Sequence, residues 1–266
     1  MKLLVCVKPV VDLETMPGPH YLRSGSSGNG TTRYRINNFD EFALEEGLRI
    51  KEACPGTTLD VITVAPQNAG SVLTRALGMG ADHAIHVLLE LEGYVSPSVV
   101  AHLITQRAKE AGYNLILAGV MAEDDMHAQV GPMIAELLSV PVATAVVHQA
   151  VLDEGRAVYV EREIEGGERE ALELVLPAVL TVQTGINRPR YPSLSKYLRA
   201  KKQQPETIHA AAQRAIDPPE TLLRVTEPQK LRTGLILEGT PEEKATRLLG
   251  ILREKALIPE ERHAEP

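Results

Sequence analysis

The sequence predicts an α/β protein that has a mainly parallel sheet, antiparallel additions and an extended C-terminal arm. Three observations support this fold class. Apolar strand-like runs alternate with amphipathic helical stretches over the first 140 residues or so, which is typical of a parallel sheet with helices on both faces. Turn signals then separate β-rich runs after Pro141, and prolines and charged residues dominate from Arg188 onward.

The first part of the chain predicts four strands and four helices in alternation. The expected strands cover residues 3–8, 59–65, 82–88 and 114–120, and the expected helices cover residues 41–53, 68–78, 97–111 and 125–138. Asn68 and Ser96 are suitable N-caps, and Pro97 suits the first position of a helix. The Gly-rich and Ser-rich stretch 16–35, between the first expected strand and the first expected helix, is interpreted as a flexible excursion, because its Gly-Asn-Gly lacks the spacing of a phosphate loop.

The second part of the chain predicts added strands and then an arm. Asp153-Glu154-Gly155 and Gly166-Gly167 are turn signals between strands expected within residues 142–147, 151–160, 172–175 and 178–182. Residues 189–241 read as an extended arm with a short helix near 194–202, and a final amphipathic helix is expected over 241–256. We therefore expect a nucleotide-binding domain over 1–188, and an arm and helix over 189–266 that pack on a partner subunit.

Composition excludes several classes of function. The chain has 266 residues and a net charge of −7, which disfavours nucleic acid as the main partner. Its two cysteines form no CxxC motif, so zinc and iron–sulfur sites lack ligands. No uncharged apolar run reaches the roughly 18 residues of a membrane helix, and Lys8 interrupts the apolar N-terminus, so we expect a cytoplasmic protein without membrane insertion.

The carboxyl ends of the parallel strands are the expected ligand site. Four segments converge there: residues 6–10, 37–40, 64–66 and 119–131. The last, GVMAEDDMHAQVG, offers backbone N–H groups at a helix start that can hold a phosphate, and Gln129 can donate to a phosphate or ribose oxygen. Its acidic residues either form a solvated N-cap, face away or accept ribose hydroxyls; they are Glu123, Asp124 and Asp125.

Other candidate residues have two interpretations each. Glu161 and Glu163 share one side of a strand and form either a polar face or an acid/base pair. His83 and His86 are more simply satisfied histidines than metal ligands, because no carboxylate or cysteine accompanies them. Cys6 fits a small core residue. The Lys201-Lys202 pair ends a helix in solvent or meets an acidic partner.

The run VEREIEGG, followed by LPAVLTVQTGINRPRYPSLSKYLRAKK, resembles the signature region of the electron-transfer flavoprotein beta subunit. VCVKPVVD, NNFDEFALEEGLRIKE, VLTRALGMGAD, LILAGVMAEDD and EPQKLRTGLILEG follow the same family in order, so the resemblance covers nearly the whole chain. It implies a Rossmann-like, adenine-nucleotide-binding fold in a heterodimer. The alpha subunit would supply most of the site for the shared FAD, and the beta subunit would hold AMP in a structural role.

The resemblance also assigns residues. Phe39 resembles the family aromatic that approaches the flavin, and Glu163 the glutamate that pairs with the alpha subunit. Leu194 resembles the leucine that plugs into a dehydrogenase pocket, while its alternative role is a staple on its own helix. The residues expected around the nucleotide are Cys6, Asn37, Asn38, Phe39, Asp40, Val64, Ala122, Glu123, Asp124, Asp125, His127, Ala128, Gln129, Val130 and Gly131. Those expected at the dehydrogenase are Leu194 with a basic rim of Lys196, Arg199, Lys201 and Lys202.

The implied function is electron transfer from flavoprotein dehydrogenases, such as acyl-CoA dehydrogenases, through the FAD to a quinone reductase, with no bond chemistry in this subunit. Ala128-Gln129-Val130-Gly131 replaces the usual Asn-Gln-Thr-Gly, and the run to Pro132 is more similar to the electron-bifurcating branch, whose beta subunit holds a second FAD that oxidises NADH. Met126-His127 and residues 89–96 depart from that branch as well. A stand-alone adenine-nucleotide sensor is a third possibility, against which the long polar arm argues.

Overall fold

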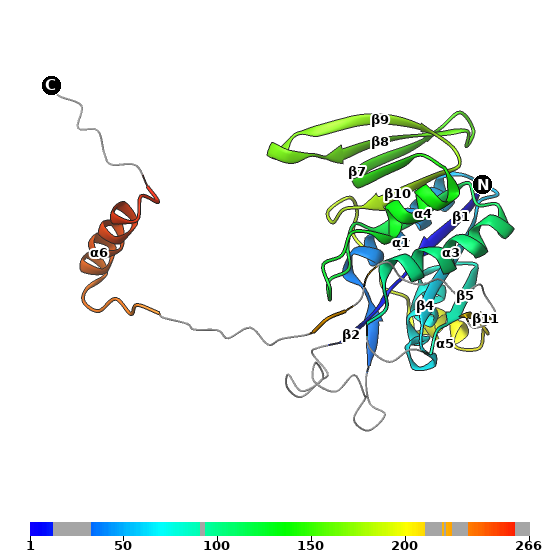
Figure 1. Cartoon of the computed structure of the whole chain (residues 1–266), viewed down its shortest axis with the longest axis horizontal. Helices are drawn as coiled ribbons and strands as arrows, with labels where there is room; N and C mark the ends of the chain where they lie inside the picture. The colour runs from blue at the N-terminus through cyan, green and yellow to red at the C-terminus, as the bar shows by residue number, and fades with distance from the viewer. Residues whose placement is uncertain (13–32, 91–93, 211–219, 221, 225–233, 259–266) are drawn as a thin grey trace. The chain divides into compact units, whose positions relative to one another are not determined.

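A computed structural model describes residues 1–12, 33–90, 94–210, 220, 222–224 and 234–258 (Figure 1). The chain divides into two compact units, Met1–Leu223 and Arg224–Pro266. The first therefore continues past the predicted boundary at residue 188, while the packing of residues 189–266 on a partner subunit stays a prediction. The stretch 13–32, most of the Gly-rich loop, lies outside the described residues.

A nine-stranded sheet organises the first unit, in the order β11-β5-β4-β1-β6-β10-β7-β8-β9. Its six core strands, all mutually parallel, are β5 (His83–Leu88), β4 (Thr58–Ala65), β1 (Lys2–Cys6), β6 (Leu115–Gly119), β10 (Ala178–Val182) and β7 (Val142–Leu152). They are flanked by β11 (Glu206–His209) at one edge, and by β8 (Ala157–Glu163) and β9 (Arg169–Val175) at the other. The predicted mainly parallel α/β fold is confirmed.

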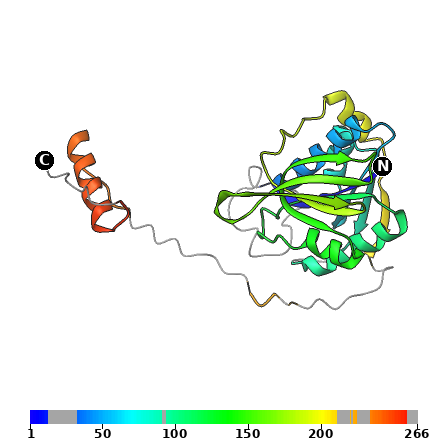
Figure 2. The ribbon, with the colours of Figure 1, turned by 90° about the horizontal axis from the view of Figure 1, so that it is seen from above.

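Helices cover both faces of this sheet (Figure 2). The helices α1 (Asn38–Ala53) and α2 (Ser71–Met79) share one apolar core with alternate residues of the strands, such as Leu3 and Val5. The helices α3 (Pro97–Ala111) and α4 (Val130–Leu138) share the other core with the intervening residues, such as Leu4 and Cys6. Strands buried on both faces are mostly apolar, which explains the predominantly apolar runs in the sequence.

Three of the predicted helix starts are wrong, and the first of these is α1, which begins at Asn38 rather than residue 41. Ser96 caps α3 as predicted, and its side chain accepts a hydrogen bond from the Ser98 N–H. Asn68, however, lies inside a short 3-10 turn, Gln67–Ala69, and α2 begins only after Gly70. The fourth helix begins at Val130 rather than residue 125, because the carboxylates that precede it are engaged elsewhere.

The additions after residue 141 are antiparallel only in part. β8 pairs antiparallel with β7 and β9, and the two predicted turns join these three strands. β10 instead inserts between β6 and β7 and is parallel to both, which corrects the prediction for residues 178–182. All five of its residues are buried, as an interior parallel strand requires.

The predicted arm also contains regular structure. A helix, α5 (Leu194–Ala200), forms where one was expected, but residues 206–209 add β11 to the edge of the sheet beside β5. Two short strands that the sequence did not indicate, β2 (Pro9–Val11) and β3 (Tyr34–Ile36), pair antiparallel on their own. In the second unit, Thr240 and Glu243 form a capping box at α6 (Pro241–Glu254). Among the described helices, none has the length and apolarity needed to cross a membrane.

Candidate functional site

The strand order places a topological switch point between β1 and β6. The chain proceeds from β1 outward to β4 and β5, and then returns across both to form β6 on the other side of β1. The helices that follow these strands consequently leave the sheet on opposite faces, and the carboxyl ends of β1 and β6 become the natural ligand position. Lys8 follows β1 there, Gly119 ends β6, and α1 begins beside them.

Asp40, in the first turn of α1, joins the two strand ends. Its buried carboxylate accepts the Lys8 N–H at 2.7 Å and the Gly119 N–H at 2.8 Å. Burial raises the pKa of Asp40 to about 6, although these two N–H groups oppose the shift. A Cβ atom on residue 119 would lie 2.5 Å from Asp40 Oδ1 and 2.6 Å from Phe39 Cβ, so only glycine permits this contact.

The acidic loop after β6 is neutralised by neighbouring cations. Lys8 Nζ contacts Asp124 at 2.7 Å and Asp125 at 2.8 Å, and these hydrogen bonds raise the pKa of Lys8 against the opposing effect of its burial. Glu123 accepts hydrogen bonds from the Arg35 guanidinium and the Asn38 N–H. The solvated N-cap interpretation is therefore wrong for these acids: they tie the loop to the ends of β1 and β3, which lowers their repulsion toward an anion.

Asn37 fixes the backbone of the same loop. Its side-chain amide donates to the Met121 carbonyl at 2.9 Å and accepts the Glu123 N–H at 3.1 Å. The loop then turns back on itself, since the Ala122 N–H donates to the His127 carbonyl. Asn37, Asn38, Asp40 and residues 122–127 are thus brought together, as the sequence predicted for this edge.

The end of the loop carries features that fit a phosphate group. Within the described part of the chain, the N–H groups of Ala128 and Gln129 have no acceptor, and the first turn of a helix, here starting at Val130, leaves further N–H groups free. Gly131 holds this turn against β10, because a Cβ there would lie 2.4 Å from Thr181 Cγ2. The predicted position for a phosphate group therefore shifts from residue 125 to residues 128–131, where α4 begins.

His127 borders the same loop and faces an aromatic residue that the sequence did not indicate. Its ring lies edge-on to that of Tyr94, with 6.2 Å between the centroids. His127 Nδ1 is buried and has no hydrogen-bond partner among the described residues. This orphaned polar atom, beside the free N–H groups of Ala128 and Gln129, is what a bound polar ligand would satisfy.

Among the remaining predicted ligand contacts, Cys6 and Val64 lie outside this loop. Cys6 is buried in the core on the α3 and α4 face, and burial raises the pKa of its thiol, with the Asp40 charge contributing. Val64 lies half-buried in β4, and Ala128 and Gln129 are exposed. Sequence reasoning placed Lys8 and Gly119 within the converging segments 6–10 and 119–131 but gave neither a role, and it missed Arg35 and Tyr94.

Other candidate groups make contacts within the chain, while the pairing of Glu163 with the alpha subunit stays a prediction. Glu161 accepts hydrogen bonds from Arg169 and Tyr159, whereas Glu163 is exposed and accepts one from Gln183. His86 is buried and contacts the Ala65 carbonyl at 3.0 Å. The described residues include no group of three or more potential ligands that could hold a metal ion.

A cavity of about 350 Å³ opens at the opposite end of the strands, among their amino ends. Its charged side chains mostly pair with one another: Arg107 with Glu206 at 2.8 Å, and Lys2 with Asp60 at 3.9 Å. Tyr113 also donates to Asp60. This cavity is therefore distant from the predicted ligand site, and we assign no ligand to it.

The predicted docking residue lies on α5, far along the chain from the switch-point loop. Leu194 is 73% exposed, beside Tyr191 at 80% and Leu198 at 51%, so the staple interpretation of Leu194 is not supported. The Ser193 side chain caps the helix by accepting the Lys196 N–H. The basic residues of the predicted rim are all exposed: Lys196, Arg199, Lys201 and Lys202. Residues 191–202, which carry the predicted docking residues, are called the docking segment.

The fold and the switch-point geometry define a Rossmann-like α/β protein. A model of the family described as "Electron transfer flavoprotein domain" matches residues 30–213. The mitochondrial electron transfer flavoprotein subunit beta of Oryza sativa subsp. indica is 35% identical, over 91% of this chain and 95% of the relative. The subunit beta of Bacillus subtilis is 32% identical, over 97% and 100%. That of Bradyrhizobium diazoefficiens is 35% identical, over 91% and 95%. The chain belongs to the electron transfer flavoprotein family, and these relatives are its beta subunits.

Proposed function

We propose that this chain is the beta subunit of a heterodimeric electron-transfer flavoprotein. It passes electrons from flavoprotein dehydrogenases, such as acyl-CoA dehydrogenases, through the FAD shared with the alpha subunit to a quinone reductase. The observation that carries the proposal is the match to beta subunits along 91–97% of the chain. The exposed docking segment gives independent support, because three large apolar side chains in solvent mark a contact surface. The cytoplasmic location stays a prediction, and the relative from rice is named as mitochondrial.

The beta subunit would hold AMP at the switch point. The N–H groups of residues 128–131 would bind the phosphate, and the Asn37–Asp40 turn would line the same edge. Lys8 and Arg35 support this role indirectly, since they neutralise the three acids beside the phosphate position. The electron-carrying chemistry belongs to the FAD, while the residues of this chain bind, orient and dock.

A second FAD in place of AMP is the alternative, and it would make the complex electron-bifurcating. It is favoured by Ala128 and Val130, which lack the hydrogen-bonding side chains found in the usual AMP-binding motif. The stand-alone sensor is disfavoured by α6, whose Leu248 and Leu249 are exposed within the second unit.

The nucleotide is tested by what the purified heterodimer releases. We expect one FAD and one AMP per heterodimer after denaturation, identified by mass and quantified by absorbance. Two FAD molecules and no AMP would establish the bifurcating alternative. No adenine compound beyond the single shared FAD would contradict a nucleotide site in this subunit.

Docking is tested by Leu194→Ala. Burial of a leucine side chain contributes about 1.5–3 kcal/mol, so we expect the dehydrogenase to bind the variant roughly tenfold or more weakly. Flavin content and thermal stability should not change, because Leu194 contacts mainly solvent in the free subunit. The measurement is the rate of electron transfer from a reduced acyl-CoA dehydrogenase at sub-saturating concentration.

Val175→Ala is the matched control for docking, since Val175 is 70% exposed and lies on β9, outside the docking segment. Its transfer rate should equal that of the wild type. Equal rates for Leu194→Ala and the wild type would remove Leu194 from the docking surface.

A further inference from the structure

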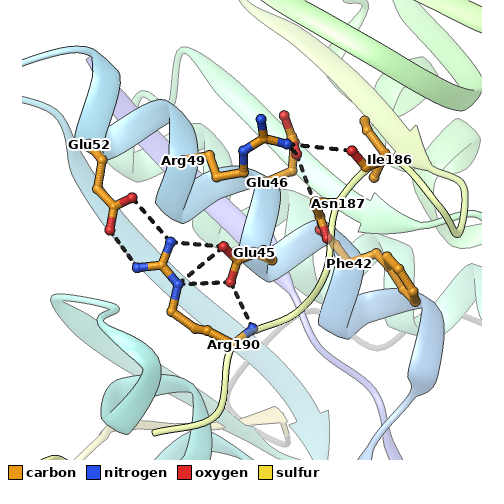
Figure 3. A network of polar contacts seen from close by, with 8 residues as sticks. All are labelled: Phe42, Glu45, Glu46, Arg49, Glu52, Ile186, Asn187 and Arg190. Atoms are coloured by element: carbon orange, nitrogen blue, oxygen red, sulfur yellow. Dashed lines mark hydrogen bonds and ion pairs between the residues drawn. The ribbon is translucent and has the colours of Figure 1, made fainter.

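A strap of eleven residues, 183–193, connects β10 to α5 and crosses α1 on its way (Figure 3). Two of its side chains, Asn187 and Arg190, reach carboxylates on α1 that are almost fully buried, Glu46 and Glu45. Neither carboxylate belongs to the switch-point site. Buried glutamates are rare unless they are paired, so Asn187 and Arg190 are expected to hold the strap on α1 through these two carboxylates.

The first anchor lies at Glu46. Asn187 Nδ2 donates to Glu46 at 2.8 Å and to the Phe42 carbonyl at 2.9 Å. Gln149 donates to the other oxygen of Glu46 at 2.8 Å, and Arg49 bonds both Glu46 and the Ile186 carbonyl. Strap, helix α1 and strand β7 therefore meet at one satisfied carboxylate.

The second anchor is Arg190, directly before the docking segment. Its backbone N–H donates to Glu45 at 3.0 Å, and its guanidinium contacts both Glu45 oxygens at 2.8–3.1 Å. The same guanidinium also holds Glu52, whose side chain is 59% exposed while that of Glu45 is 6% exposed. A forked, largely buried pair fixes direction as well as distance, which a lysine could not do.

Helix α2 supports the other side of the docking segment. A Cβ on Gly78 would lie 3.1 Å from Pro192 Cβ and 3.4 Å from Tyr197 Cα, so the two backbones approach closely there. The Arg75 guanidinium lies over the Tyr191 ring, 5.0 Å from its centroid. Ala200 is buried at the end of α5. Only the outward side of the segment is left free, and it carries Leu194.

We infer that Arg190 and Glu45 are positioning residues for partner docking, which hold the docking segment in its exposed conformation before the partner arrives. This inference rests on the proposed function of that segment. Apolar side chains on a loose loop would lose backbone and rotamer freedom on binding, and that loss weakens affinity. An anchor at the base of the segment removes much of this loss in advance without touching the partner.

The experiment uses the complete heterodimer and a purified medium-chain acyl-CoA dehydrogenase reduced with octanoyl-CoA. Arg190→Gln should raise the KM for the heterodimer about tenfold and leave kcat unchanged. Hydrogen exchange of the amides in residues 190–200 should accelerate in the same variant. Glu45→Gln should also raise the KM. The KM of Arg190→Lys should lie between those of Arg190→Gln and the wild type, because lysine keeps the charge but loses the forked geometry.

Glu52→Gln is the matched control, because it removes the exposed half of the same contact, and exposed ion pairs contribute little. Flavin content reports assembly, and if Arg190→Gln does not assemble, Arg190→Lys and Glu45→Gln decide the question. If Leu194→Ala binds the dehydrogenase more weakly while the Arg190 and Glu45 variants keep the wild-type KM, the positioning role alone is overturned. An unchanged KM in Leu194→Ala would overturn the docking surface and the inference with it.

Discussion

Replacing Gly119 with alanine is expected to lower the free energy of unfolding by about 3 kcal/mol or more and to abolish nucleotide retention. The added Cβ would lie 2.5 Å from Asp40 Oδ1 and 2.7 Å from the Phe39 carbonyl carbon. The second of these atoms is backbone at the start of α1, so no side-chain rotation can relieve the overlap. Strand β6 and helix α1 must separate, and the two hydrogen bonds to Asp40 are strained or lost.

The measurements for Gly119→Ala are denaturant unfolding of the heterodimer and the AMP content after denaturation. Gly70→Ala is the matched control, since Gly70 has a helical φ of −62° and its added Cβ would meet the His86 ring at an ordinary 3.4 Å. Its stability should stay within about 0.5 kcal/mol of the wild type. Wild-type stability in Gly119→Ala would show that β6 and α1 do not meet as described.

The parallel half of the fold could be predicted because each of its strands carries its own signal. Residues 59–65 are apolar except for Asp60 and Thr63, and all but the half-buried Val64 are buried, so pattern and environment largely agree. The position of β10 in the sheet could not be predicted in this way. Residues 178–182 follow a hairpin in sequence, and only the choice of neighbours, β6 and β7, makes the strand parallel.

Edge structure was harder to recognise because its stabilisation comes from a neighbour. Residues 206–209 are Glu-Thr-Ile-His and lie among polar residues and prolines, so nothing local distinguishes them from an arm. They form a strand because β5 offers a free edge to pair with. The strap 183–193 is similar: Arg190 reads as one more surface cation until α1 places Glu45 beneath it.

The candidate site could be located from the sequence, but its internal pairing could not. Chain order identifies residues 37–40 and 119–131 as neighbours at the strand ends. Which cations neutralise Glu123, Asp124 and Asp125 depends on side chains more than 85 residues away in the sequence, Arg35 and Lys8. Since those carboxylates are engaged by Lys8 and Arg35, and the loop turns back on itself between Ala122 and His127, α4 begins five residues later than its acidic start signal indicated.

The ionisation of Asp40 should make stability depend on pH in an unusual direction. Its pKa is raised from an ordinary 3.8 to about 6 by burial, so between these values the folded state binds more protons at this site than the unfolded state. The free energy of unfolding must then fall as pH rises through this window. The contribution of Asp40 is fully present below pH 3.8 and is lost above pH 6, and its size is about 3 kcal/mol.

Asp40→Asn isolates this effect, because asparagine does not titrate. As pH rises from 4 to 7, the free energy of unfolding of the wild type should fall by about 2.4 kcal/mol relative to that of the variant, measured by denaturant titration at each pH. The absolute stability of the variant should be lower at acid pH, since its amide group faces the N–H of either Lys8 or Gly119 and leaves one donor without an acceptor.

Asp125→Asn is a control of opposite sign in the same site. Burial alone would raise the pKa of Asp125, but hydrogen bonds from the Lys8 ammonium and the His127 N–H outweigh it and lower the pKa. Its stabilisation is therefore present above its ordinary pKa and disappears as pH falls, so the two variants should change the slope of stability against pH in opposite directions. If both variants change the slope in the same direction, or if Asp40→Asn leaves it unchanged, Asp40 does not titrate as a buried carboxyl bridging β1 and β6.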